Sequence, residues 1–323
     1  MKKVAFHKSG LMLIVGCAVS CLVHFIGIPA VCAQSPFNLS ISGNVMPQAG
    51  FEHSDASYAS YQMNVKASLV LLNLGYTFTA FTWKQADMLT LGNGQDTLWE
   101  QLHQLTLGTA YMGELNERWA YLMVAQGEAA FEKTIEKSFQ EWMAIGGGQY
   151  TLSERWKLLF GGGVRYTDFK TVLLPAGGFQ WDAGYGISLS MIFPKESKIQ
   201  YQSANQKFSA YIDFFPDSSA EIAYAFSPSL KTALSYVLSE KDTYRLADNS
   251  LVNLKQGRKY LETDAQVLNL DLTYTPFKHL ACDLGVSYRF ERKLSILDDD
   301  EKMLKKLKGD DSVGGAMVLT YNF

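Results

Sequence analysis

The segment LACDLGVSYRFE, residues 280–291, alternates between two kinds of side chain. Every second residue from Leu280 to Phe290 is apolar or aromatic, and the residues between them are small, polar or charged. A repeat of two is the side-chain period of a β-strand, so this segment predicts a strand with one apolar face and one polar face. Residues 268–274 repeat the pattern, and Pro276 to Lys278 connects them to Leu280. The pair predicts a hairpin of two long strands.

The same alternation continues outward from this hairpin in both directions. Regular strands are predicted at 63–71, 74–80, 105–111, 160–166, 208–214, 222–226 and 234–238, and less regular ones at 37–46, 119–131, 139–150, 185–193 and 313–323. Aromatic residues make up 13% of the chain, and such a composition favours strands. We therefore expect about 12–14 strands, the range that uncertain strand boundaries allow.

The expected connections between these strands alternate in length. Short connections are expected at 72–73, 113–118, 153–155, 194–197, 227–229 and 276–278, and long ones at 47–60, 84–101, 167–183, 240–262 and 291–312. Short turns at one end and long loops at the other are typical of an up-and-down transmembrane barrel. The fold class predicted is therefore all-β, a single antiparallel transmembrane β-barrel over residues 34–323.

Residues 1–33 have the features of a secretory signal peptide. Lys2, Lys3 and Lys8 precede a nearly continuous apolar run from Leu11 to Ile28, and small residues follow before Gln34. An uncleaved single-helix anchor is one alternative, because the apolar run is long. A lipoprotein cleavage before Cys17 is the other. Cleavage before Gln34 leaves Cys282 alone of the four cysteines, so a mature monomer forms no disulfide.

The last strand predicts the cellular location of the barrel. Met317, Leu319, Tyr321 and Phe323 occupy every second position up to the end of the given sequence. Such an ending resembles the signature read by the bacterial barrel-assembly machinery. A soluble lipocalin-type barrel has the opposite orientation of faces, but the strand number and the interfacial aromatic residues favour the membrane type. We expect a Gram-negative outer-membrane protein that contacts outer-membrane lipid and the assembly machinery, with its oligomeric state left open.

Several segments of the C-terminal third resemble a family of bacterial outer-membrane β-barrels of unknown function. They are Phe214-Phe215-Pro216, the segment 220–224, the segment 243–246 and the segment 285–294. The resemblance implies a barrel and an outer-membrane address. It implies no activity.

The ionisable residues outside the strands indicate no enzyme. His53, His103 and His279 are the histidines of the predicted mature chain, and adjacent residues such as His53 and Ser54 point to opposite faces of an extended segment. A hydrolase site at the barrel rim is therefore a third possibility, behind solvated histidines. The formal charge of −3 becomes more negative without the signal peptide, so no nucleic-acid partner is expected.

The acidic run from Asp298 to Glu301 precedes several lysines in the last long loop. Clustered carboxylates can hold Ca²⁺, but the alternating ligands and central glycine of a calcium loop are missing here. A short surface helix, acidic at its start and basic toward its end, explains the same residues through the helix dipole. We therefore predict neither a metal site nor a cofactor.

The strand alternation also predicts which charged residues face the lumen. They are Lys66, Arg165, Asp213, Glu221, Lys231, Asp271, Asp283, Arg289 and Glu291. Such residues can line a solute path, or they can pair across the lumen and stiffen it. Counted from the turn at 276–278, Asp271 and Asp283 should lie at nearly the same level. Arg289 is too far along its strand to neutralise them and should pair elsewhere.

Two functions follow from these expectations. The first is a porin-like barrel that passes small solutes through its lumen. The alternative is a structural or surface-contact barrel that acts through its extracellular loops and has a closed lumen. Twelve or more strands enclose more space than side chains normally fill, which favours the first function. The second would hold if residues 167–183 or 240–262 fold into the lumen.

Overall fold

A computed structural model describes residues 37–69, 72–89, 98–193, 196–214, 218–247, 251, 254 and 257–323. The signal peptide expected at 1–33 lies outside these residues and stays a prediction. No helix among the residues described is long and apolar enough to cross a membrane.

The described chain consists almost entirely of β-strands joined into one sheet. Their bounds are β1 (Asn38–Phe51), β2 (Ser54–Ser68), β3 (Asn73–Lys84), β4 (Gln101–Glu114), β5 (Trp119–Phe131), β6 (Phe139–Ser153), β7 (Trp156–Thr167), β8 (Thr171–Gly184), β9 (Ile187–Phe193), β10 (Glu196–Gln202), β11 (Phe208–Asp213), β12 (Ser219–Ser227), β13 (Leu230–Arg245), β14 (Tyr260–Phe277), β15 (Leu280–Leu297), β16 (Met303–Lys308) and β17 (Ser312–Asn322). Two short 3-10 turns, η2 (Ala86–Leu89) and η3 (Ile135–Lys137), lie in connections.

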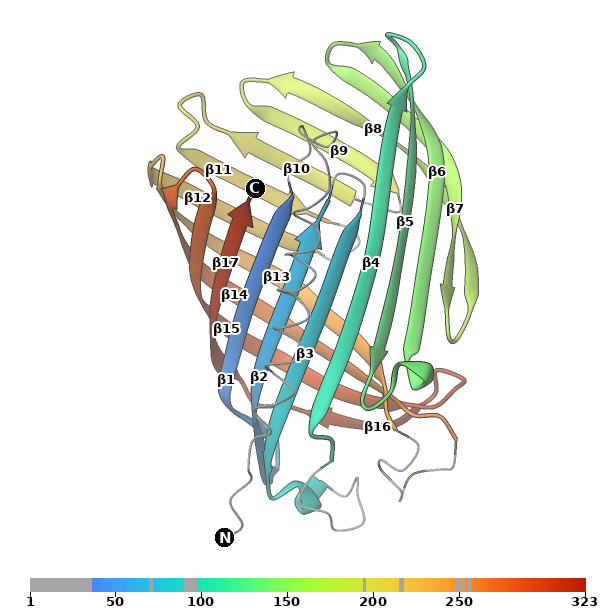
Figure 1. Ribbon diagram of the computed structural model, residues 1–323, viewed down its shortest axis with the longest axis vertical. Coiled ribbons are helices and arrows are strands. Elements are labelled where there is room, and N and C mark those ends of the chain that lie inside the picture. The colour runs from blue at the N-terminus through green and yellow to red at the C-terminus, as the bar shows by residue number, and fades with distance from the viewer. Residues whose placement is uncertain are drawn as a thin grey trace. The chain divides into compact units, whose positions relative to one another are not determined.

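The sheet closes on itself into an antiparallel barrel (Figure 1). Each strand from β1 to β15 pairs with the next one, and β1 pairs with both β2 and β17, with Asn38 opposite Asn322. Both β16 and β17 pair with β15, so they occupy one position and the barrel described has 16 positions. The predicted fold class is confirmed. The expected number of strands was too low.

The missed strands are β8, β10 and β16; because β16 shares one position with β17, β8 and β10 account for the two missing positions of the barrel. Most of β8 falls in the connection expected at 167–183, because Pro175 and the pair Gly177-Gly178 resemble a turn. In the structure Pro175 lies where β8 pairs only with β7, since pairing with β9 begins at Gly177. A proline that lacks an N–H is tolerated at such an unpaired edge. The sequence of β10, ESKIQYQ, is short and mostly polar, so it carries little strand signal.

Two other connections are shorter than expected. Residues 47–60 form strand up to a tight turn at Glu52-His53, where His53 has a φ of 61°. Residues 291–312 contain the end of β15 and all of β16. Longer connections remain at 85–100 and 246–259. We call the end of the barrel that holds these two connections the loop end, and the opposite end the turn end.

The barrel is not equally wide along its axis. β9, β10, β11 and β12 have 7, 7, 6 and 9 residues, whereas β13, β14 and β15 have 16, 18 and 18. Beyond Val237, β13 no longer pairs with β12, and its last residue, Arg245, pairs in parallel with Phe131 of β5. The ring at the loop end therefore contains only β1–β5 and β13–β16. We call this part the narrow tier and the part with all positions the wide tier.

The wide tier carries the membrane-facing surface. Its outward apolar side chains are exposed, as for Leu270 (56%), Val286 (55%) and Ile222 (51%). An outward apolar band of this kind is the feature by which a transmembrane barrel contacts lipid. The main buried apolar cluster lies instead inside the narrow tier.

Candidate functional site

An apolar core fills the narrow tier, and we call it the cap. Trp99 and Trp83 lie at its centre, 2% and 8% exposed, with their rings edge to face at 5.1 Å. The Trp83 Nε1–H donates a hydrogen bond of 2.6 Å to the backbone oxygen of Trp99. The other buried members of the cap are Met46, Ala49, Phe51, Ala56, Tyr58, Ala86, Leu89, Leu98, Leu102, Ala130, Tyr244, Leu246, Leu251, Leu261, Leu294 and Ile296.

The number of strands explains why side chains can close this end. A ring of about eight strands is just wide enough for side chains to fill, whereas a wider ring leaves space inside. The cap contains residues from opposite walls, such as Ala56 of β2 and Leu261 of β14. The axial path through the loop end is therefore closed in this structure.

The closure comes partly from a segment that sequence reasoning did not select. The connection 85–100 supplies Ala86, Leu89, Leu98 and Trp99 to the cap. The connection expected at 240–262 contributes Leu246 and Leu251, as the closed-lumen alternative required. The other candidate, 167–183, is wrong because those residues mainly form β8. The pair Leu98-Trp99 was the available signal, since large apolar residues in a long loop need a place to be buried.

A seam joins β5 to β13 on the side of the cap. The backbone N–H of Glu132 donates to the oxygen of Arg245 at 3.1 Å, and the N–H of Ala247 donates to the Glu132 carboxylate at 2.8 Å. Below the seam, Tyr260 packs edge to face on Phe169 at 4.7 Å. These contacts fix the end of β13 against strands that are far from it in sequence.

One carboxyl at the seam has a shifted pKa. Burial raises the pKa of Asp168, which lies in the connection between β7 and β8. The Tyr260 hydroxyl donates to this carboxylate at 3.4 Å and partly offsets the shift. Nearby, Lys170 and Glu301 form an exposed ion pair at 3.1 Å. The charged groups thus tie the connection between β7 and β8 to the loop end of β14 and β15.

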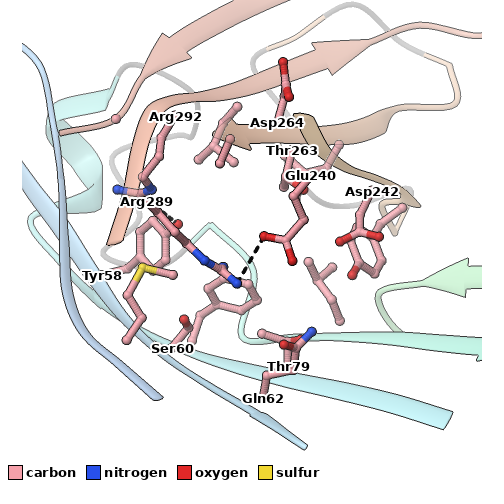
Figure 2. Close-up of a pocket in the computed structure, with 18 of the residues that line it drawn as sticks. Tyr58, Ser60, Gln62, Thr79, Glu240, Asp242, Thr263, Asp264, Arg289 and Arg292 are labelled. Carbon is pink, nitrogen blue, oxygen red and sulfur yellow. Dashed lines mark hydrogen bonds and ion pairs between the residues drawn. The ribbon is translucent and has the colours of Figure 1, made fainter. Parts of the chain in front are cut away.

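A cavity of about 110 Å³ borders the cap, and we call it the chamber (Figure 2). Cap residues form part of its wall, and charged residues of β13, β14 and β15 form another part. Arg289 contacts Glu240 at 3.1 Å across the intervening strand β14. Arg292 donates to the Tyr58 hydroxyl and, at 2.8 Å, to the backbone oxygen of Asp310. The chamber therefore presents charges of both signs beside an apolar wall.

A β-bulge places both arginines in the chamber. Arg289 and Arg292 are three residues apart, so strict alternation would put them on opposite faces. Glu291 has a φ of 50°, and the pairing of β14 with β15 shifts between Asp264 and Gln266. Because the bulge inserts an extra residue, Arg292 lines the chamber where continued alternation would have placed Glu291. Sequence reasoning missed Arg292 for this reason.

The remaining lumen candidates are spread along the wide tier. Arg165 makes two hydrogen bonds of 2.8 Å with Glu141, and Lys231 lies 4.0 Å from Glu221. The other positions are Lys66 on β2 beside Gly75, Asp213 on β11 accepting from the Ser197 N–H, Asp271 on β14 opposite Gly285, and Asp283 on β15 opposite Thr273. The structure thus brings Arg165 and Lys231 together with carboxylates of neighbouring strands. A solute path along them stays a prediction.

Asp271 and Asp283 are diagonal neighbours in the ladder, two residues out of register, so they lie close together but not at the common level expected from the turn. Arg289 pairs with neither of them, because its partner is Glu240 on β13. The expectation that Arg289 pairs elsewhere therefore agrees with its position.

The three histidines have separate surroundings. His103 lies in β4, where its Nδ1 and the Tyr76 hydroxyl share a hydrogen bond of 2.8 Å. His279 lies in the turn before β15, with its Nδ1 2.8 Å from the backbone oxygen of Asn322. His53 forms the tight turn between β1 and β2. The structure does not bring them together into one site.

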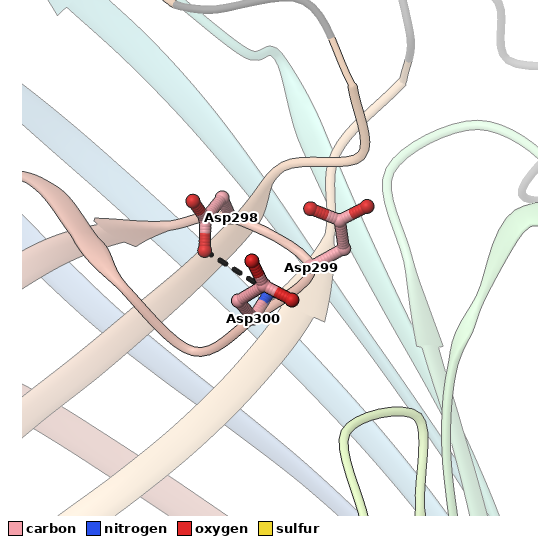
Figure 3. Close-up of side chains that lie close together, drawn as sticks. All are labelled: Asp298, Asp299 and Asp300. Carbon is pink, nitrogen blue, oxygen red and sulfur yellow. Dashed lines mark hydrogen bonds between the residues drawn. The ribbon is translucent and has the colours of Figure 1, made fainter.

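Three aspartates lie close together at the end of β15 (Figure 3). Their ligand oxygens lie within 4.8 Å of one another. The Asp298 carboxylate accepts hydrogen bonds from the backbone N–H groups of Asp300 (3.0 Å) and Lys302 (2.9 Å). The expected short helix is wrong, because these bonds form a turn and β16 follows. The arrangement is explained by the turn itself, since aspartate commonly bonds its own backbone in turns.

The alternating C-terminal residues lie on the outside of β17. Met317, Leu319 and Tyr321 are 44%, 41% and 42% exposed. The ring of Phe323 lies 4.8 Å from that of Phe37, where the first and last strands meet. Recognition of this strand by the assembly machinery stays a prediction.

No family model and no curated protein matches the sequence. Among solved structures, the Pseudomonas putida toluene transporter TodX is 10% identical, with 90% of each chain covered and a TM-score of 0.36. The Acinetobacter baumannii outer membrane protein Omp33 is 9% identical, with 89% of this chain and 99% of that chain covered and a TM-score of 0.34. A Pseudomonas aeruginosa FadL homologue is 9% identical, with 91% and 92% covered and a TM-score of 0.33. Scores this low support no particular function.

Proposed function

We propose that this protein is a bacterial outer-membrane channel for small solutes, closed in the described state by the cap. The observation that carries the proposal is the width of the wide tier. A barrel with 16 positions encloses more space than its own side chains fill, and a purely structural barrel has no need of it. The charged candidates on its strands supply polar groups for hydrated solutes.

The cap acts as the gate in this proposal. Part of it belongs to the described residues of the connection between β3 and β4, Ala86, Leu89, Leu98 and Trp99, which lie outside the paired strands. Two hydrogen bonds tie this part to β3, from the Phe81 N–H to the Glu100 oxygen at 2.8 Å and from Trp83 Nε1–H to the Trp99 oxygen, so it can move away at the cost of these two bonds without breaking the ladder of the barrel wall. Opening therefore requires exposing Leu89, Leu98 and Trp99, and the sheet stays closed.

Conductance measurements test the proposal. Purified protein reconstituted in planar bilayers should show rare openings, and a Leu98→Ala/Trp99→Ala variant should show frequent ones. Tyr111→Ala/Tyr121→Ala is the matched control, because these two rings pack at 5.7 Å at the turn end, outside the cap. It should leave the opening frequency unchanged. The absence of conductance steps in the cap variant, in a protein that still shows heat-modifiable migration, would overturn the channel.

The second candidate is a barrel with a permanently closed lumen that acts through its surface. The seam between β5 and β13 favours it, because backbone hydrogen bonds join the two strands. Hydrogen exchange separates the candidates. Protection of the 85–100 amides equal to that of the β14 amides would favour the closed barrel, whereas faster exchange of the connection alone would favour the gate.

A further inference from the structure

We infer that the chamber binds a small zwitterion, a solute with a carboxylate and an ammonium group such as an α-amino acid. The inference deepens the proposed channel by naming a class of solute. It rests on the channel only for the role of the site in passage, because binding to the chamber can be measured without conduction.

Arg292 supplies the first argument. It is 6% exposed and lines the chamber, yet its hydrogen-bond acceptors are the Tyr58 hydroxyl and the backbone oxygen of Asp310, which are both neutral. No carboxylate in the described part of the chain lies within ion-pair distance of it. A buried charge without a countercharge is unfavourable, so a bound anion would compensate it.

Unused donors supply the second argument. Arg289 contacts Glu240 through one terminal nitrogen, and its Nε is buried with no hydrogen-bond partner. The Nε1 of Trp99, which is 2% exposed, also has no partner. Guanidinium and indole nitrogens only donate, and both side chains line the chamber. A carboxylate between the two arginines would supply the acceptors that this side lacks.

Acidic side chains line the side of the chamber away from Tyr58. Figure 2 shows Arg289 and Arg292 near Tyr58, Glu240 in contact with Arg289, and Asp242 farther from both arginines. Both carboxylates line the chamber, and the Glu240 side chain is 47% exposed. Two carboxylates near a bound anion would repel it, whereas they attract an ammonium group on the same molecule. The pattern of charge therefore fits a zwitterion better than a simple anion.

The chamber has room for a small solute. Its volume of about 110 Å³ is enough for several water molecules, so a solute of a few heavy atoms such as a small amino acid fits. Leu102 of the cap and Phe81, which packs against the cap, offer apolar surface to a short side chain.

Titration calorimetry on the purified full-length barrel in detergent tests the inference. Three probes are compared. L-Alanine carries both charges, acetate carries only the negative charge, and methylammonium carries only the positive charge. We expect L-alanine to bind at least about tenfold more tightly than either of the others, since its two charges are recognised together. Equal binding of acetate and L-alanine would overturn the zwitterion, and no binding of any probe would overturn the site.

Variants assign the two halves of the site. Arg292→Gln should weaken the binding of L-alanine and of acetate alike, by about tenfold, because it removes the positive charge that both carboxylates contact. Asp242→Asn should weaken the binding of L-alanine and leave the binding of acetate unchanged or tighter. This second variant tests the site even if the Arg292 variant does not fold. The control is Arg155→Gln, in the turn between β6 and β7, which should bind as the unmodified protein does. Unchanged L-alanine binding in Asp242→Asn would overturn the ammonium contact.

The outcomes for binding and for conduction are separable. L-Alanine binding without conductance in any cap variant would retain the site and reject the channel. Conductance in the cap variant, together with no L-alanine binding to the unmodified protein, would retain the channel and reject the site.

Discussion

The wide tier and the narrow tier share long strands but differ in where those strands place their apolar side chains. On β14, Leu270 belongs to the wide tier and is 56% exposed on the outside, whereas Leu261 belongs to the narrow tier and is 0% exposed inside the cap. The same residue type on the same strand thus contacts lipid in one tier and a protein core in the other. On β14 this follows from unbroken alternation, because Leu261 and Leu270 are an odd number of residues apart; the extra residue of the nearby register shift lies on the partner strand β15.

The difference follows from the solvent on each side of the wall. In lipid the outer face must be apolar and the lumen can be wet, whereas outside the membrane the outer face must be polar and the apolar residues go inside. A strand that crosses from one surrounding to the other must move its apolar residues to the inner face. In β15 one extra residue in a bulge does this, whereas β14 does it by a change in its sequence pattern without an extra residue. The bulge in β15, and the one between Val237 and Glu240 in β13, lie where the tiers meet.

The sharpest test of this comparison replaces the two leucines of β14. Leu261→Ala should lower the free energy of unfolding of the narrow tier by about 2–5 kcal/mol, because it removes buried methyl groups and leaves a cavity. Leu270→Ala should cost on the order of 0.5 kcal/mol, since that side chain only exchanges contacts with lipid. Urea unfolding of the reconstituted barrel measures both. Equal losses would contradict a core inside the narrow tier.

The sequence predicted the wide tier much better than the narrow one. Alternation around Leu280 to Phe290 decided the barrel, because lipid on one face and lumen on the other enforce a period of two. That period fails at Glu291, where the bulge exchanges the two faces of β15. The sequence pattern therefore predicted neither Arg292 as a chamber residue nor the ion pair of Arg289 with Glu240. The cap could not be predicted from the local sequence either, because Trp99 packs against strands that are remote from it in sequence. The seam of β5 with β13 depends on the closed sheet and has no local signal.

A second prediction concerns a charge on the outside of each tier. Leu270→Arg should lower the stability of the barrel in bilayers by about 2–4 kcal/mol, because the charge faces hydrocarbon. Met303→Arg should change it by less than about 0.5 kcal/mol, since Met303 is 56% exposed on β16 in the narrow tier and faces water. Folding yield into vesicles of increasing thickness reports the difference. A cost for Met303→Arg as large as that for Leu270→Arg would place the narrow tier inside the membrane.

A third prediction separates the two tiers by their effect on ions. Asp271 and Asp283 lie near the turn end of the wide tier, close enough for their negative charges to act together on a passing ion. Asp271→Asn with Asp283→Asn should reduce the preference for cations in reversal-potential measurements on a cap-opened background. Heat-modifiable migration checks that the barrel still folds. An unchanged reversal potential would remove these two acids from the conducting path.

The smallest expected effect concerns the ion pair of Arg165 with Glu141, which tests whether wide-tier charges stiffen the wall. The two groups form a bidentate contact, but their side chains are 50% and 24% exposed, so water screens much of the attraction. A double-mutant cycle of Arg165→Gln and Glu141→Gln should give a coupling of at most about 1 kcal/mol, the value typical of exposed pairs. The coupling should also fall as salt increases from 0.05 to 1 M, since exposed pairs are screened. A coupling of several kcal/mol that is insensitive to salt would mean that this part of the lumen excludes water, and it would contradict a wet interior in the wide tier.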